Sequence, residues 1–540
     1  MISLQKLNNS LFLGIFIAIF LLVNITALKG QEVFYHISNS SLYDFLDEMA
    51  NSQLIDLNTA IKPYSRSFIS SKLYDLEKQK EQLNERQIRD LKFFLKDFNK
   101  ELKPDKDFSK RFDILYYKDS LFTFSINPIL GIQYFTNNNG SATHWWNGAE
   151  AFAYIGKHWG FYASLRDNHD EQFLSRPEYI TQRMGANYKG NGDYSEMRGG
   201  ISYSWDWGSA GLIKDHFTWG NNYNGSNIFS GRTPSVPQIY LRMKPVKWFE
   251  FSYTHAWLVS EVVDSTRSYW TNSSYGMEYR EVYHPRYIAT NLFTFTPVEK
   301  LNLSFGNSIV YTDLGVYPGY LIPLVFFKSI DHSTNHGIDN QNSQLFFDVS
   351  SRNIKNLHLY SSLFIDELAT SRIFNPEESN FYSWKIGGRL SNFPLQNISL
   401  TIEYTRSNPL TFQHYMPTLE FESNKFNLGH YLEDNSQELY ISIAAKPLRG
   451  LYLHASLLFA QKGPDYDDVG GDRLGLPFIE TVEWENKSFS FLARYEIIND
   501  AFLILEFQNS NISGNDLTKY THPMWHGKTS TFSTGINFGF

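Results

Sequence analysis

Apolar side chains recur at every second position from about Arg111 to the end of the chain. In Ile398–Thr405, for example, isoleucine, leucine and tyrosine alternate with serine, threonine and glutamate. This period places one row of side chains on each face of a β-strand. The same pattern recurs through residues 111–540, which make 430 positions. The feature therefore predicts a large antiparallel β-structure rather than a mixed or helical fold.

The last strand decides between a water-soluble β-sandwich and a membrane barrel. Apolar and threonine side chains occupy alternate positions from Phe532 to Phe540, and we expect all of them on one face. A barrel needs such a strand, because its last strand must pair with its first to remove the sheet edge. A C-terminal aromatic also resembles the signal read by the barrel-assembly machinery. We predict an outer-membrane β-barrel embedded in lipid.

The strand number follows from the length of the alternating region. An outer-membrane strand needs about 9–11 residues, and with turns and loops each strand uses roughly 24. This predicts about 18 strands, and 16 to 20 are acceptable. Wall side chains cannot fill a lumen of that size, so loops must plug it or it conducts.

Composition agrees with this location and excludes several classes of protein. The chain has 44 Phe, 34 Tyr and 12 Trp, yet its mean hydropathy is -0.36, as expected for strands with one lipid face and one wet face. It has no Cys, which excludes a lipoprotein anchor, disulfides and thiolate metal sites. A net charge of -8 gives no electrostatic reason for a nucleic-acid partner.

The N-terminal region precedes the alternation and divides into two parts. Residues 1–30 contain the apolar run Leu11–Val23 and predict a secretory signal cleaved before Gln31; a retained anchor is the alternative. Residues 31–106 have helical periodicity, with Asn84 and Gln87 placed as a helix start, and predict a small periplasmic helical segment. Residues 107–540 form the predicted barrel.

Several segments resemble the Wzi family of outer-membrane capsule-assembly proteins. The segments, in the order of that family, are Ile61–Arg66, Leu83–Phe98, Trp219–Leu241, Tyr320–Pro323 leading to Asp339 and Asn340, Leu363–Leu368 and Leu428–Leu439. The resemblance implies an 18-stranded barrel above a periplasmic helical bundle. It also implies a blocked lumen and a lectin-like role in holding capsular or other surface polysaccharide.

Two sets of residues are candidates for polysaccharide binding, because an aromatic ring can cover the apolar face of a sugar while amides bind its hydroxyls. The first set lies in the family-like segment: Trp219, Asn221, Asn222, Tyr223 and Arg232. The second set comprises Trp145, Trp146 and Trp270, which lie in polar surroundings. The alternative is that the tryptophans belong to interfacial girdles and the asparagines form turns.

Metal binding and catalysis have little support. The acidic stretch 465–472 lacks EF-hand spacing and predicts a solvated loop. Asp331, His332 and His336 lie in a predicted loop, 328–343, where an i, i+4 pair does not converge. Motifs for acyl or phosphoryl transfer are missing from the sequence, so we predict no cofactor and no enzyme activity. The function predicted is polysaccharide binding; the alternatives are a transport pore and a surface component for adhesion or gliding motility.

Overall fold

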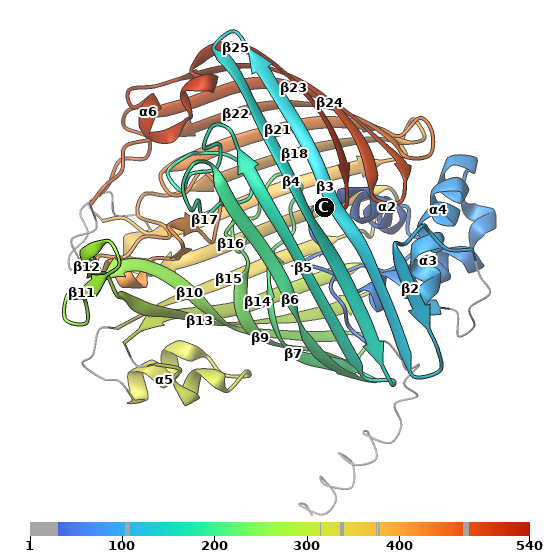
Figure 1. The fold of residues 1–540 in the computed structure, drawn as a ribbon, viewed down its shortest axis with the longest axis horizontal. Coiled ribbons are helices and arrows are strands. Elements are labelled where there is room, and N and C mark those ends of the chain that lie inside the picture. Colours follow the sequence, from blue (N-terminus) through green and yellow to red (C-terminus); the bar gives the residue numbers. More distant parts are fainter. Residues whose placement is uncertain are drawn as a thin grey trace, which may run out of the picture.

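The computed structural model describes residues 31–102, 109–313, 315–334, 340–373, 375, 378–467 and 475–540. The predicted signal lies outside these residues, as do His336 and most of the acidic stretch. The described chain forms a closed antiparallel barrel of 18 strands (Figure 1), which confirms the predicted fold and strand number. In the described part of the chain, no helix is both long and apolar enough to cross a membrane.

The barrel strands follow one another around the wall in chain order. They are β3 Phe122–Asn137, β4 Gly140–Ile155, β5 Trp159–Asp170, β6 Asp193–Trp205, β7 Gly208–Asp215, β9 Val236–Val246, β10 Phe249–Val263, β13 Tyr283–Val298, β14 Leu301–Thr312, β15 Gln341–Ser351, β16 Leu357–Glu367, β17 Phe381–Ser391, β18 Ile398–Ser407, β21 Ser436–Ala445, β22 Leu451–Lys462, β23 Trp484–Ile498, β24 Ala501–Ser513 and β25 Gly527–Phe538. A short strand, β2 Leu115–Lys118, pairs with the start of β3.

The two ends of the barrel differ in the length of their connections. One end has short turns, such as 206–207, 247–248 and 299–300. The other end has long connections, such as 216–235 and 408–435. Outer-membrane barrels place short turns toward the periplasm and long loops outside. We refer to these as the short-turn end and the long-loop end.

The closing strands show how alternation forms the wall and where it stops. Phe532 to Phe538 of β25 pair with β3, and Phe532 and Ile536 are exposed on the outer face. The prediction that Phe540 shares this face is wrong. Gly539 has φ +82, a conformation that glycine adopts easily, and it turns the chain inward. Phe540 is buried and stacks on His36 with ring centres 4.0 Å apart.

Three helices form a small bundle before the barrel. They are α2 Ser40–Asn51, α3 Arg66–Lys78 and α4 Glu85–Leu102, and their apolar faces share a core that includes Leu46, Ile69 and Phe98. The predicted start of α4 is confirmed as a reciprocal capping box, with N–H groups of Asn84 and Gln87 each donating to the other side chain at 3.0 and 2.9 Å.

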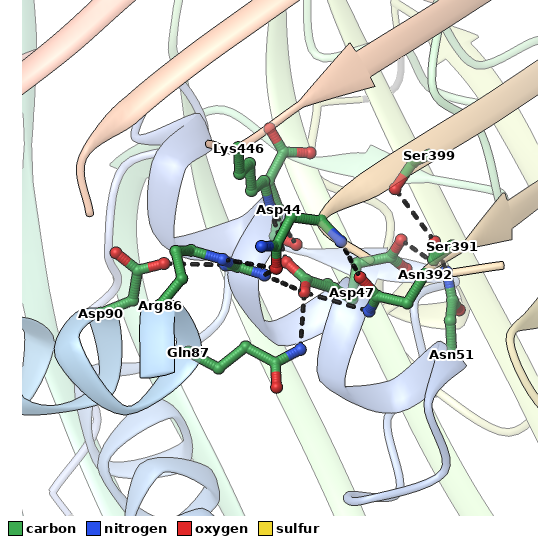
Figure 2. Close-up of polar contacts among 12 residues, drawn as sticks. Asp44, Asp47, Asn51, Arg86, Gln87, Asp90, Ser391, Asn392, Ser399 and Lys446 are labelled. Carbon is green, nitrogen blue, oxygen red and sulfur yellow. Dashed lines mark hydrogen bonds and ion pairs between the residues drawn. The ribbon is translucent and has the colours of Figure 1, made fainter. Parts of the chain in front are cut away.

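The bundle lies against the short-turn end of the barrel. Asn51 and Asn84 donate to Ser391 and Asn397 at 3.1 and 3.0 Å, and Lys446 pairs with Glu48 at 3.2 Å. Figure 2 shows Asn51 of α2 beside Ser391, and Lys446 beside the same helix. The helical segment therefore covers the short-turn end of the lumen with hydrogen bonds and ion pairs.

Smaller elements lie in the long connections. They include the hairpins β11 Tyr269–Ser273 with β12 Gly276–Arg280 and β19 Glu422–Ser423 with β20 Phe426–Asn427, and the helices α5 Phe327–Thr334 and α6 Leu517–Tyr520. The prediction of a loop throughout 328–343 is wrong, because α5 contains Asp331 and His332 and β15 begins at Gln341.

Candidate functional site

The connection between β7 and β9, residues 216–235, enters the lumen; we call it the inner loop. Its strand β8, Thr218–Trp219, pairs with β1, Ile61–Lys62, which belongs to the helical segment. Gly220 also donates its N–H to the carbonyl of Ala60 at 2.8 Å. The inner loop therefore starts at the long-loop end and reaches the segment that covers the opposite end.

Trp219 lies in an apolar core inside the lumen. Its side chain is 1% exposed, and its ring lies 5.4 Å from Phe229 and 6.1 Å from Phe346 on β15. This core also includes Phe217, Ile228, Val236, Ala256, Leu258, Ile288, Leu292, Val310, Phe364, Phe412, Phe421 and Leu428. In this arrangement, Trp219 has no free face to offer a sugar.

The amide and hydroxyl groups of the inner loop bind the barrel wall and the helical segment. The Asn221 N–H donates to the Asp348 carboxylate at 2.8 Å, and its side chain bonds both Asp348 and Thr59. The Tyr223 hydroxyl lies 2.7 Å from Asp47 and 2.8 Å from His358. These groups attach the inner loop to two regions that are far apart in the sequence, residues 47–59 and 348–358.

Asn222 and Arg232 are also engaged within the protein. Asn222 donates to the carbonyl of Gly220 at 2.8 Å. The buried guanidinium of Arg232 donates to the carbonyls of Tyr431 and Tyr179, each at 3.2 Å. The five predicted residues of 219–232 thus lie on the inner loop, and Asn221, Tyr223 and Arg232 use polar side-chain groups to bond other parts of the chain.

Buried ion pairs attach the helical segment to the barrel near the hydroxyl of Tyr223. Asp47 pairs with Arg352 at 2.7 Å and lies 3.7 Å from Arg389. Burial alone would raise the pKa of the Asp47 carboxyl, but the two guanidinium groups hold this pKa well below its usual range. Burial likewise opposes ionisation of Glu48, yet Lys446 and Arg86 lower its pKa to about 2.

Trp145 and Trp146, neighbours on β4, point to opposite faces of the wall. Trp145 is 42% exposed beside its outward cross-strand partner Ile132, and it stacks on His169. This is the position of an interfacial girdle residue. Trp146 points inward and is buried, with the Arg166 guanidinium 4.6 Å from its ring centre. The structure does not bring these two indoles together.

Trp270 lies on the β11–β12 hairpin at the long-loop end. It is 64% exposed and lies directly opposite Tyr279, with ring centres 5.3 Å apart. Tyr269 and Tyr275 of the same hairpin are also exposed. These tyrosines are not among the residues predicted to bind sugar, although tyrosine is dense in residues 269–283 of the sequence. The hairpin projects from the long-loop end (Figure 1), and its aromatic side chains are exposed.

A small cavity lies between the helical segment and strands β4, β5 and β6. This cavity of about 30 Å³ is lined by residues that include His36, Glu150 and Arg198. This volume suits a water molecule rather than a sugar ring. Among the described residues, no group of three or more His, Asp or Glu side chains is placed to hold a metal ion.

No family model matches the chain, and no curated protein matches it in sequence. Solved outer-membrane barrels are similar in structure. Wzi, an outer-membrane protein involved in group 1 capsule assembly in Escherichia coli and described as a carbohydrate-binding β-barrel, matches with a TM-score of 0.57 at 11% identity, over 95% of this chain and 100% of its own. That likeness shows the outer-membrane barrel fold.

Two further barrels match more distantly. OccAB2 of Acinetobacter baumannii matches with a TM-score of 0.42 at 10% identity, over 77% of this chain and 97% of its own. OprD of Pseudomonas aeruginosa matches with a TM-score of 0.41 at 9% identity, over 77% of this chain and 94% of its own.

Proposed function

We propose that this outer-membrane barrel binds surface polysaccharide at its long-loop end, without catalysing a reaction. The observation that carries the proposal is the exposed hairpin of β11 and β12, where Trp270 and Tyr279 form a paired aromatic surface. Carbohydrate binding is also the property described for Wzi, the similar barrel. Outer-membrane lipid and the barrel-assembly machinery are the other partners that we expect.

The chemistry of the hairpin suits a repeating glycan. Aromatic faces cover the apolar C–H face of a sugar ring, while Asn272, on the same face of the hairpin as Trp270, offers an amide for its hydroxyls. A single sugar would bind such an open surface weakly. A polysaccharide repeats the same epitope, so that many weak contacts along one chain act together.

The inner loop favours holding a ligand over conducting solutes. Its apolar core and its hydrogen bonds to β15 and α2 occupy a part of the lumen that an open pore would leave to water. A transport pore is the competing function, and it makes the opposite prediction. In planar bilayers, we expect the purified protein to give almost no ion conductance at neutral pH. Steady porin-like steps would contradict this part of the proposal.

Direct binding tests the role of the hairpin. Purified full-length protein is titrated with polysaccharide extracted from the surface of its own cells. We expect saturable binding that weakens in the double variant Trp270→Ala, Tyr279→Ala. Trp248→Ala is the matched control, because Trp248 is also exposed but lies in the 247–248 turn at the short-turn end. Equal affinity in all three proteins would show that the hairpin is not the site.

A deletion strain tests the role in the cell. We expect cells without the protein to release polysaccharide into the medium. Complementation with the hairpin variant should restore the protein in the membrane without restoring retention. Full retention of surface polysaccharide in the deletion strain would refute the proposed function. A motility defect without loss of polysaccharide would instead favour the adhesion or gliding role.

A further inference from the structure

Residues 315–334 lie outside the barrel and pack against its wall; we call this segment the outer flap. It contains a 3-10 turn, Pro318–Leu321, and helix α5. Tyr320 and Phe327 are fully buried against wall residues that include Phe251 and Tyr311. Figure 1 shows α5 outside the ring of strands, next to the wall formed by β10, β13 and β14. The flap therefore covers an outer face that in most of the barrel is open.

The wall beneath the flap carries polar side chains on its outer face. Tyr253, Asn291, Asn307 and Tyr311 lie on three neighbouring strands and point outward, in register with apolar residues such as Phe305. A polar group without a hydrogen-bond partner is costly in lipid, because no water is present there to bond it. Such residues are unexpected in a lipid-facing wall unless another part of the protein supplies hydrogen-bond partners for them.

The flap backbone provides those bonds. The Asn291 amide donates to the carbonyls of Pro323 and Val325 at 2.9 and 3.0 Å, and the Tyr253 hydroxyl donates to the carbonyl of Tyr320 at 2.7 Å. In return, the Phe327 N–H donates to the Asn307 side chain at 3.0 Å. The wall and the flap thus satisfy each other's hydrogen-bonding groups. Non-helical backbone at membrane depth is tolerated only where its polar groups are bonded in this way.

The other side of the flap is apolar. Val316–Phe327 contains no charged residue over twelve positions. Four of its large side chains are exposed and point away from the wall: Leu321, Ile322, Leu324 and Phe326. A segment facing water in a long-loop connection would be expected to carry polar side chains here.

The position of the flap along the wall places it between lipid-facing residues. On the short-turn side, Leu303 and Phe305 of β14 are exposed on the outer face. On the long-loop side, Val259 of β10 is exposed on the same face. Between them, the flap is hydrogen-bonded to the outward residues Tyr253, Asn291 and Asn307. Its exposed apolar surface is therefore continuous with the apolar belt of the barrel.

We propose that the outer flap is embedded in the outer leaflet of the membrane, with Leu321, Ile322, Leu324 and Phe326 in contact with lipid acyl chains. The partner of this surface is lipid rather than protein because the surface continues the belt and lacks charge. The polar residues of β10, β13 and β14 are present because they hold the flap backbone. The flap thus widens the hydrophobic perimeter of the barrel on one side.

A single spin label tests this placement, and the absence of Cys from the chain makes every introduced cysteine unique. Leu324→Cys is labelled in the purified full-length protein and reconstituted in phosphatidylcholine vesicles. Label accessibility is measured to oxygen, which partitions into lipid, and to a water-soluble nickel chelate. Leu303→Cys serves as the lipid reference on the wall, and Tyr275→Cys as the water reference on the hairpin.

We expect the Leu324 label to match the Leu303 label, with high accessibility to oxygen and low accessibility to nickel. Accessibility like that of the Tyr275 label would place the flap in water and overturn the proposal. A label inaccessible to both reagents would place protein on this surface, such as a second copy of the chain, and would also overturn it. Ile322→Cys, on the same surface, repeats the measurement if Leu324→Cys folds poorly.

Discussion

Two connections at the long-loop end, the inner loop 216–235 and the connection 264–282 that bears the β11–β12 hairpin, carry tryptophan to opposite environments. Trp219 of the inner loop is buried among phenylalanines in the lumen, while Trp270 of the hairpin is exposed. Both loops are rich in aromatic and small polar residues. The two tryptophans differ in burial because the two loops have different contacts with the rest of the protein.

The inner loop forms hydrogen bonds with several other parts of the protein. Its amides and hydroxyls reach Asp348, Asp47 and Glu403, and its strand β8 pairs with β1. The hairpin bonds mainly within itself, through the pairing of β11 with β12. Local composition is therefore a poor guide to whether a barrel loop folds inward, because the decision depends on partners supplied by distant strands.

The largest effect that we expect is on stability, from Trp219→Ala. Removing a fully buried indole leaves a cavity in the lumen core and should lower the free energy of unfolding by about 4 kcal/mol. Urea unfolding of the protein in detergent micelles measures this change. Trp248→Ala, at an exposed position, should change stability by less than about 0.5 kcal/mol. Similar losses in both variants would contradict the assignment of Trp219 to a packed core.

Part of this arrangement could be predicted from the sequence. Period-two alternation predicted the wall because it reports on one strand at a time, and Asn84 with Gln87 predicted a helix start because the cap is local. The contacts of Asn221 with Asp348 and of Tyr223 with Glu403 join residues 127 and 180 positions apart. No local pattern contains such pairings. Phe540 was misplaced for a local reason, since Gly539 ends the alternation.

The attachment of the inner loop to the helical segment is tested by Asp47→Ala. This change leaves the buried Arg352 guanidinium without its carboxylate and removes an acceptor from Tyr223. Breaking a buried pair in this way should cost about 3 kcal/mol. Urea unfolding measures the loss, and Asp75→Ala is the control, because Asp75 is exposed on α3. An effect no larger than that of the control would show that the attachment contributes little.

Acid should weaken the attachment of the helical segment to the short-turn end of the barrel, through the pairing of Glu48 with Lys446. The pKa of Glu48 is lowered from 4.5 to about 2 in the folded protein, so the folded state favours the carboxylate. The stabilisation by Glu48 is therefore complete at a pH above the pKa of this group in the unfolded state. It is lost as the pH falls toward the pKa of the group in the folded state. Between about pH 6 and pH 3, the free energy of unfolding should fall by about 2 kcal/mol from this group. Unfolding curves of Glu48→Gln should be correspondingly less dependent on pH, and an unchanged pH dependence would rule out this role for Glu48.

The smallest expected effect, and the one specific to the hairpin, is that of Trp270→Ala on polysaccharide affinity. An exposed aromatic contact contributes on the order of 1 kcal/mol to the free energy of binding. Its loss corresponds to a roughly fivefold larger dissociation constant. Because Trp270 is exposed and stacks on Tyr279 of its own hairpin, stability should stay within about 0.5 kcal/mol of the unmodified protein. Titration and urea unfolding of the same preparation separate the two quantities. A loss of stability without a loss of affinity would reverse the contrast between Trp219 and Trp270, since the exposed indole would then be the structural one.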